Sequence, residues 1–292
     1  MIRFHKAYVS AVVHSGLMSS QHPVESTASA MPFLRWAGSK RRLVPIIRTY
    51  WKPSYKRYLE PFAGSACLFF CLKPARAILG DLNGELISMY MEVKHRLDEV
   101  LDQLSPLHRS KHLYKSMRSL DPNKLTPAAR AARLIYLNRY CFNGLYRTNL
   151  KGEFNVPYGG KGSGNLPSAN LLRDCSKSLT RARLVAGDFE RVLRCAKKGD
   201  FVYMDPPFAV RARRVFNEYH PETFGGDDIK RLRVWLEKLD QRKISFLVSY
   251  AESAEAHVLA KGFNCRRISV RRNIAGFAVD RSNSYEILIS NI

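Results

Sequence analysis

Acidic residues are scarce in this chain of 292 residues, where 25 Asp and Glu are set against 48 Lys and Arg. The formal net charge of +23 and the sequence pI near 10.0 lie outside the usual range of a neutral metabolic enzyme and predict a polyanionic partner. The chain also lacks an apolar run long enough to cross a bilayer, so we expect no membrane-spanning segment.

Two kinds of ligand-binding motif are missing as well. The six cysteines form no CxxC pair and no His-Cys spacing suited to zinc, so we expect reduced, mostly buried thiols in the cytoplasm and no bound metal. No GxGxxG occurs to bind the pyrophosphate of a dinucleotide, which argues against a nicotinamide oxidoreductase.

Basic residues occur in clusters along the whole chain, and aromatic residues lie close to several of these clusters. Interleaved basic and aromatic side chains favour nucleic acid over an acidic membrane as the polyanion. The clusters are Lys40 to Arg42; Arg130, Arg133 and Arg139; Arg211, Arg213 and Arg214; and Arg266, Arg267, Arg271 and Arg272.

Residues 1–30 show no periodic pattern and contain several turn-forming residues, which predicts a flexible extension. The basic start and the short apolar run after it faintly resemble a signal peptide, but His14 interrupts the run. We therefore expect no secretion, and translation that begins at Met18 or Met31.

From Pro32 onward, short apolar runs alternate with amphipathic stretches, which is typical of an α/β fold built on a largely parallel sheet. Residues 31–84 and 176–292 are expected to form this sheet domain. The predicted strands are 58–59, 77–79, 184–186, 201–204, 246–248 and 287–289.

Residues 85–175 lie between the second and third predicted strands and indicate an inserted module. Apolar residues recur at helical spacing over 85–104, and Thr126-Pro127 provides a cap and a first-turn proline for a helix that ends at Asn143-Gly144. Residues 145–156 predict a β-hairpin, and the glycine-rich residues 159–165 predict a flexible basic loop.

The most informative motif is Asp205-Pro206-Pro207-Phe208, which directly follows the apolar run 201–204. In open α/β sheets ligands bind just beyond such strand ends, and the two prolines stiffen the loop. The Asp205 carboxylate and the Pro206 carbonyl then form two fixed acceptors beside the Phe208 ring. This combination suits the exocyclic amine of a nucleobase, although the motif alone is equally consistent with an ordinary loop.

Further acids follow other predicted strands. Residues 58–66 predict a strand, a tight turn and a helix start, in which Gly64 lets the backbone approach a ligand. Asp81 follows Gly64 by 17 residues, close to the spacing at which an acid reaches a ribose hydroxyl. Asp188 ends another strand, so that Asp81, Asp188 and Asp205 fall along one edge of the sheet. Together they predict a site for a nucleoside cofactor.

Five motifs of this chain resemble those of the Dam-type DNA adenine-N6 methyltransferases of the D12 class. They also occur in the order found in the α group of that family. The resemblance extends from Pro32 to Asn291 and implies a Rossmann-like methyltransferase sheet, with residues 85–175 as an inserted helical plus β-hairpin target-recognition domain. The motifs are Phe33 to Lys40, Glu60 to Ser65, Asp81 to Asn83, Cys141 to Gly159 and Asp205 to Phe208.

The resemblance implies S-adenosyl-L-methionine as the cofactor. Lys40 is expected near the methionine carboxylate, Asp81 at the ribose, and Asp188-Phe189 at the adenine of the cofactor. The implied catalytic residues, which would bind a flipped-out adenine, are Asp205, Pro206, Pro207 and Phe208. The implied cofactor-binding residues are Trp36, Lys40, Glu60, Pro61, Phe62, Gly64, Asp81, Asp188, Phe189 and Asp205.

The same resemblance implies double-stranded DNA as the partner and GATC as the target. Arg147 is expected to reach a base edge in the major groove, while Phe142 and Leu145 wedge into the base stack. Pro157 is implied at a thymine methyl and Arg35 at the first base. The full set of implied DNA-binding residues is Arg35, Phe142, Asn143, Leu145, Arg147, Asn149 and Pro157.

Two positions depart from the pattern of the family. Phe208 replaces the usual tyrosine, but stacking requires only the ring, so activity should be retained. Ala66 replaces a common glycine, and its extra methyl group is expected to weaken cofactor binding.

Two alternative functions remain open, a cytosine-N4 methyltransferase with the same chemistry and a non-catalytic DNA-binding protein that retains the fold. We expect a monomeric, cytoplasmic, nucleoid-associated enzyme of bacterial or phage origin. Restriction-modification, repair marking and phage protection stay open as its biological role.

Overall fold

The structure, a computed structural model, describes residues 31–149, 151–208, 224–270 and 284–292. The predicted extension 1–30, with Met18, lies outside the described residues. So do Leu150 and several members of the predicted basic clusters, namely Arg211, Arg213, Arg214, Arg271 and Arg272.

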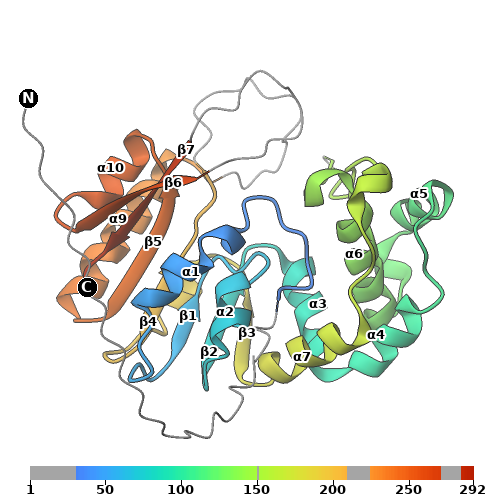
Figure 1. The fold of residues 1–292 in the computed structure, drawn as a ribbon, viewed down its shortest axis with the longest axis horizontal. Coiled ribbons are helices and arrows are strands. Elements are labelled where there is room, and N and C mark those ends of the chain that lie inside the picture. Colours follow the sequence, from blue (N-terminus) through green and yellow to red (C-terminus); the bar gives the residue numbers. More distant parts are fainter. Residues whose placement is uncertain (1–30, 150, 209–223, 271–283) are drawn as a thin grey trace, which may run out of the picture.

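Seven described strands form one sheet in the order β3-β2-β1-β4-β5-β7-β6, and of these β7 alone runs in the direction opposite to the other six (Figure 1). Six of the strands contain the six predicted apolar runs, so the prediction of a largely parallel α/β sheet is confirmed. The strands are β1 (Tyr58–Glu60), β2 (Ala77–Asp81), β3 (Ala182–Ala186), β4 (Phe201–Met204), β5 (Ser245–Ala251), β6 (Asn264–Val270) and β7 (Ser284–Ser290).

The sequence did not predict strand β6, because Asn264, Arg266 and Arg267 interrupt its apolar residues. In the described sheet β6 is the edge strand and pairs with β7. Charged side chains are typical of edge strands, where they discourage pairing with another chain. Part of the basic cluster predicted around residue 266 therefore belongs to a strand.

Alternate residues along the strands supply two hydrophobic clusters, because successive side chains of a strand point to opposite faces. Tyr58 and Tyr203 belong to the first cluster, with residues of α2, α3 and α7, whereas Leu59 and Met204 belong to the second, with residues of α8, α9 and α10. The helices are α1 (Val44–Ile47), α2 (Cys67–Leu72), α3 (Gly84–His95), α4 (Leu97–Leu104), α5 (Lys111–Ser119), α6 (Pro127–Tyr140), α7 (Ala169–Leu179), α8 (Glu190–Leu193), α9 (Gly226–Gln241) and α10 (Ala254–Ala260).

The strand order reverses at β1. From β1 the chain continues to β2 and β3 on one side, and later to β4 and β5 on the other. Such a reversal opens a crevice beyond the carboxyl ends of β1 and β4. Glu60 is the last residue of β1 and Asp205 directly follows β4, so the topology places both acids at this crevice.

Helices α3 to α7 lie between β2 and β3 in the chain. The helical pattern over 85–104 is divided into α3 and α4 at Arg96, where φ of −136° and ψ of 45° interrupt the helix. Helix α6 begins as predicted, since the Thr126 hydroxyl oxygen accepts a hydrogen bond from the Ala129 N–H at 3.2 Å. After α6 the backbone turns at Asn143 and Gly144, which both have positive φ.

The region predicted as an inserted module contains two packing environments. Residues of α3, α4, α6 and α7 share the first hydrophobic cluster with the sheet. A separate cluster lies toward the end of the molecule opposite β6 (Figure 1). It consists of Tyr114, Tyr136, Leu137, Tyr140, Cys141, Phe154 and Val156. The domain boundaries at 85 and 175 stay a prediction.

The predicted hairpin 145–156 is present in a short form. Its arms are joined by an antiparallel bridge between Thr148 and Phe154 and by a hydrogen bond of 3.0 Å from the Asn155 N–H to the Arg147 carbonyl. Residues 159–165, which follow the hairpin, were predicted to form a flexible loop, but in the structure part of this segment is helical.

A short 3-10 helix forms at Gly160–Ser163, where Ser163 is buried. Arg35 Nη1 donates to the Ser163 carbonyl at 2.9 Å, and the Arg139 guanidinium donates to the Asn165 carbonyl. Arginines from other segments thus bind the carbonyl groups that a glycine-rich loop cannot pair by itself.

Candidate functional site

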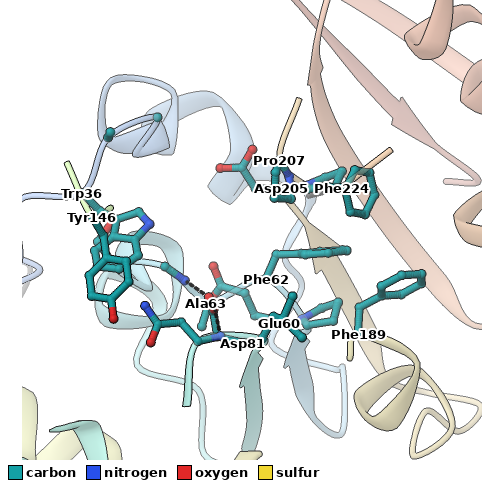
Figure 2. A pocket seen from close by; sticks show the side chains of 18 of the residues that line it. Trp36, Glu60, Phe62, Ala63, Asp81, Tyr146, Phe189, Asp205, Pro207 and Phe224 are labelled. Carbon is teal, nitrogen blue, oxygen red and sulfur yellow. Dashed lines mark hydrogen bonds between the residues drawn. The ribbon is translucent and has the colours of Figure 1, made fainter. Parts of the chain in front are cut away.

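A cavity of about 1180 Å³ lies at the carboxyl ends of β1, β2 and β4. Figure 2 shows Trp36 and Tyr146 on one side of it and Phe62, Phe189 and Phe224 on the other, with the acidic side chains between. The structure brings all predicted catalytic and cofactor-binding residues to this cavity, namely Trp36, Lys40, Glu60, Pro61, Phe62, Gly64, Asp81, Asp188, Phe189, Asp205, Pro206, Pro207 and Phe208. Their individual roles stay predictions.

The turn after β1 is held by the acid at the end of β2. Asp81 accepts hydrogen bonds from the Gly64 N–H and the Asn83 N–H, one on each carboxylate oxygen and both at 2.9 Å. Gly64 has φ of +46°, and a Cβ there would lie 3.0 Å from Trp36 Cδ1. Glycine at this position therefore permits both the turn and the close approach of the indole ring.

The cavity holds several carboxyl groups that are costly to ionise. Glu60 is 2% exposed and accepts a hydrogen bond from the Tyr58 hydroxyl at 2.9 Å. Burial raises the pKa of Glu60 well above its ordinary value, the Tyr58 hydrogen bond opposes this shift, and the charges of Asp205 and Asp81 add to it. Burial likewise raises the pKa of Asp81. A ligand with positive charge would relieve this repulsion.

Asp205 is paired with a buried ammonium group. Lys40 Nζ lies 2.7 Å from Asp205 Oδ1, and the Ser249 hydroxyl donates to the same oxygen at 3.3 Å. Burial raises the pKa of Asp205, whereas Lys40 and Ser249 act in the opposite direction. Lys40 was expected near the methionine carboxylate of the cofactor. In the structure the Lys40 ammonium group contacts Asp205, the predicted catalytic acid. Lys40 Nζ also lies 3.7 Å from Glu286 Oε1.

Phe208 lines the cavity and is partly exposed. Its side chain is 41% exposed, and its ring packs edge-on against Tyr250, with ring centroids 5.6 Å apart at an angle of 90°. Lys40 Nζ lies 5.5 Å from the Phe208 centroid. The Phe208 ring and the Asp205 carboxylate thus both line the cavity and both lie near Lys40 Nζ.

The opposite end of the cavity is aromatic. Phe62 and Phe189 are stacked with centroids 5.3 Å apart, and Phe224 packs edge-on against Phe62 at 5.8 Å. Asp188 Oδ1 accepts hydrogen bonds from the Glu190 N–H at 2.9 Å and from Arg231 Nη2 at 2.8 Å. These contacts create a wall of aromatic rings with one carboxylate beside it.

Sequence reasoning missed Arg231, Phe224 and Tyr146 as cavity residues. Arg231 and Arg233 lie two residues apart in an amphipathic helix rich in basic residues. No signal in the sequence indicates that Arg231, and not Arg233, lines the cavity. Tyr146 lies next to Arg147, and its ring stacks on Trp36 with centroids 5.8 Å apart at 21°. Such contacts join segments far apart in the chain, so local patterns do not predict them.

Two of the predicted DNA-binding residues line the cavity, and the others lie outside it. Leu145 and Arg147 line the cavity, and Arg147 Nε donates to Asn155 Oδ1 at 2.8 Å. Phe142 is 42% exposed outside the cavity, and its N–H donates to the Pro157 carbonyl at 2.9 Å.

Four further predicted DNA-binding residues, Arg35, Asn143, Asn149 and Pro157, also lie outside the cavity. Asn143 and Asn149 occupy turns, and the Asn149 side chain accepts hydrogen bonds from the N–H groups of Lys151 and Glu153 at the hairpin tip. Arg35 Nη1 donates to two backbone carbonyls, of Ser163 at 2.9 Å and Arg139 at 3.3 Å. The side chains of Arg35 and Asn149 thus already form hydrogen bonds with the backbone of the protein itself.

We expect Gly144→Ala to destabilise the protein by at least about 2 kcal/mol, because the added Cβ would clash with the backbone of Arg35 in addition to the strain of alanine in a left-handed conformation. Gly144 has φ of +67°, and a Cβ would lie 2.6 Å from the backbone carbonyl oxygen of Arg35. The matched control is Gly152→Ala, with φ of +77° but no atom within 4 Å. Urea denaturation should show the larger loss for Gly144→Ala, and equal losses would contradict the steric explanation.

Ala66 adopts a left-handed conformation with φ of 49°, which explains why a glycine suits this position. The residue is 1% exposed, belongs to the first hydrophobic cluster and does not line the cavity. The expected steric effect of its methyl group on a bound cofactor is therefore not supported.

The described residues include neither a membrane-spanning helix nor a cluster of metal ligands. No described helix is both long enough and apolar enough to cross a membrane. No group of three or more His, Cys, Asp or Glu side chains in the described ranges could hold a metal ion.

Comparisons with known proteins agree with the geometry. The family model of the D12 class N6 adenine-specific DNA methyltransferases matches residues 36–274. The type II methyltransferase M1.LlaDCHI of Lactococcus lactis subsp. cremoris is 35% identical, over 89% of this chain and 95% of its own length.

Two other relatives extend the comparison. The type II methyltransferase M.MjaIII of Methanocaldococcus jannaschii is 33% identical, over 89% of this chain and 98% of its own length. The DNA adenine methylase of Escherichia coli K12 is 32% identical, over 88% of this chain and 93% of its own length. With a family model that matches most of its length and a cavity that joins the expected motifs, the chain belongs to the D12 class of N6 adenine-specific DNA methyltransferases.

Proposed function

We propose that this methyltransferase transfers a methyl group from S-adenosyl-L-methionine to N6 of an adenine flipped out of duplex DNA, within the sequence GATC. The observation that carries the proposal is the single cavity shared by the acid-rich cofactor turn and the Asp205-to-Phe208 motif. An acceptor amine and a donor bound in one cavity are held in the geometry that direct transfer requires.

The residues present fit S-adenosyl-L-methionine. Its sulfonium and ammonium groups are cationic, and the cavity offers Glu60, Asp81 and Asp205 as carboxylates whose pKa values are raised by burial. Its adenine is flat and suits the wall formed by Phe62 and Phe189. When bound, the cofactor would supply an electrophilic methyl group on sulfur.

The protein residues then orient the acceptor. The Asp205 carboxylate and the Pro206 carbonyl accept hydrogen bonds from the N6 amine of the target base, which stacks near Phe208. These bonds turn the nitrogen lone pair toward the methyl group. When the methyl group passes from sulfur to nitrogen, N6 would have to release a proton, and Asp205 would be placed to accept it.

Target recognition is assigned to the hairpin and its surroundings. Arg147 lines the cavity, and its Nε is held by Asn155, so its guanidinium can present a fixed fork to a guanine edge. Phe142, five residues earlier in the chain, is exposed, as a side chain that wedges into a base stack must be. The net charge of +23 supplies the attraction to the phosphate backbone.

We expect expression of the full chain, in a host without adenine methylation, to produce N6-methyladenine within GATC. Nucleoside analysis of the genomic DNA identifies the modified base, and sequencing of modified bases identifies the site. Arg147→Ala should reduce discrimination against altered sites by roughly tenfold to a hundredfold, because one bidentate base contact is lost.

The control for Arg147 is Lys151→Ala at the exposed hairpin tip, which should weaken DNA binding uniformly without changing the site. N4-methylcytosine, or unmodified DNA from a folded and DNA-binding protein, would overturn the proposal. N6-methyladenine at another sequence would reject GATC alone.

A further inference from the structure

Arg231 of α9 lines the cavity and gathers three carboxylates around one guanidinium group. Its Nη2 lies 2.8 Å from Asp188 Oδ1, its Nε 3.0 Å from Glu190 Oε1 and its Nη1 2.8 Å from Asp228 Oδ1. The guanidinium carbon also lies 4.8 Å from the centroid of the Phe189 ring. Each of the three guanidinium nitrogens is thus engaged, which fixes the plane of the group.

The contact with Arg231 helps to fix the orientation of the Asp188 carboxylate at the cavity. Both hydrogen bonds recorded for Asp188 within the described residues use Oδ1, one from Arg231 and one from the Glu190 N–H. The side chain is 40% exposed and lines the cavity, so Oδ2 remains accessible to a ligand. Two fixed donors on one oxygen therefore orient the carboxylate and leave its other oxygen as an acceptor.

We infer that Arg231 is a positioning residue for the purine of the cofactor, which acts by holding Asp188 as an oriented acceptor for an exocyclic amino group. This inference rests on the proposed function, because it assigns the Asp188 and Phe189 end of the cavity to the adenine of S-adenosyl-L-methionine. An amine donates to Asp188 Oδ2, whereas a 6-oxo group in its place would face a carboxylate without a proton between them. Arg231 thereby contributes to selection of an adenine cofactor over its deaminated form.

The chain offers a matched control two residues further along α9. Arg233 also pairs with a carboxylate, since its Nη2 lies 2.9 Å from Glu237 Oε1, and its guanidinium lies 4.7 Å from the Phe263 centroid. Its side chain is 19% exposed, against 41% for Arg231, and it does not line the cavity. Truncation of Arg233 should therefore disturb the helix at least as much as truncation of Arg231.

The experiment measures binding of two probes to the full chain by calorimetry: S-adenosylhomocysteine and its 6-oxo counterpart, S-inosylhomocysteine. The wild-type protein should prefer the 6-amino compound by roughly tenfold to a hundredfold, as expected for a hydrogen bond to a charged acceptor. Arg231→Gln should lower this preference to within about threefold, mainly by weaker binding of the 6-amino compound. Arg233→Gln should retain the wild-type preference.

A wild-type preference that persists in Arg231→Gln would overturn the inference, as would an equal loss of preference in Arg233→Gln. Failure of the proposed function has a different signature, because the wild-type protein would then bind neither probe and transfer no methyl group. Thermal unfolding of both variants shows whether they remain folded at the temperature of the titration.

Discussion

Asp205→Ala is expected to reduce methyl transfer by roughly 10³-fold or more, while affinity for duplex DNA stays close to that of the wild-type protein. The substitution removes the carboxylate that is proposed to accept the amine hydrogen bond and to orient the nitrogen lone pair. DNA affinity is proposed to depend instead on basic and hairpin residues outside the motif. Single-turnover methylation and fluorescence anisotropy with the same duplex measure the two quantities separately.

Two variants accompany this measurement. Asp205→Asn retains one oxygen acceptor without its charge and should show an intermediate rate, since a neutral acceptor forms the weaker hydrogen bond. Asp227→Ala removes an exposed carboxylate of α9 outside the cavity and should leave the rate unchanged. An alanine variant at 205 that methylates at the wild-type rate would remove Asp205 from the mechanism.

The second large effect is expected for Lys40→Met, which breaks the ion pair of 2.7 Å with Asp205. Removal of one partner from a largely buried ion pair costs stability, and here it leaves Asp205, whose side chain is 21% exposed, without its ammonium group. Burial already raises the pKa of Asp205, and loss of Lys40 raises it further, because Lys40 favours the ionised form. Activity that requires the carboxylate must then shift toward higher pH.

The pH dependence of single-turnover methylation tests this prediction. In Lys40→Met the acidic limb of the profile should move to higher pH, with a rate near neutrality lower by roughly a hundredfold and partial recovery in alkaline buffer. Arg41→Met removes an exposed neighbouring charge and should leave the limb where it is in the wild-type protein. Superimposable profiles for Lys40→Met and the wild-type protein would refute the coupling.

The parts of this protein that local sequence determines were predictable. Six strands follow from continuous apolar runs, and the start of α6 follows from a capping threonine and a first-turn proline. The motif proposed to be catalytic was recognisable because Asp205 directly follows a buried strand and two prolines limit its backbone. In each case neighbouring residues carry enough information to select one conformation.

The parts that depend on distant contacts were not predictable. Strand β6 forms although Arg266 and Arg267 interrupt it, because β7 provides a partner along its whole length. Lys40 contacts Asp205 across 165 positions of the chain, and Arg231 reaches Asp188 from a helix that follows β4. Only the order of the strands brings these groups together, and that order is a property of the whole fold.

The hydrophobic cluster shared by the sheet and by α3, α4, α6 and α7 has a consequence for where the protein methylates. A recognition element on a flexible linker would sample many distances from the catalytic acid. Here Arg147 follows α6, whose residues Leu134 and Ile135 are buried in the same cluster as Tyr203 of the strand that precedes Asp205. In the proposed function Arg147 reads one base and the Asp205 motif binds another, so this close packing would fix the separation of the two bases within the DNA site.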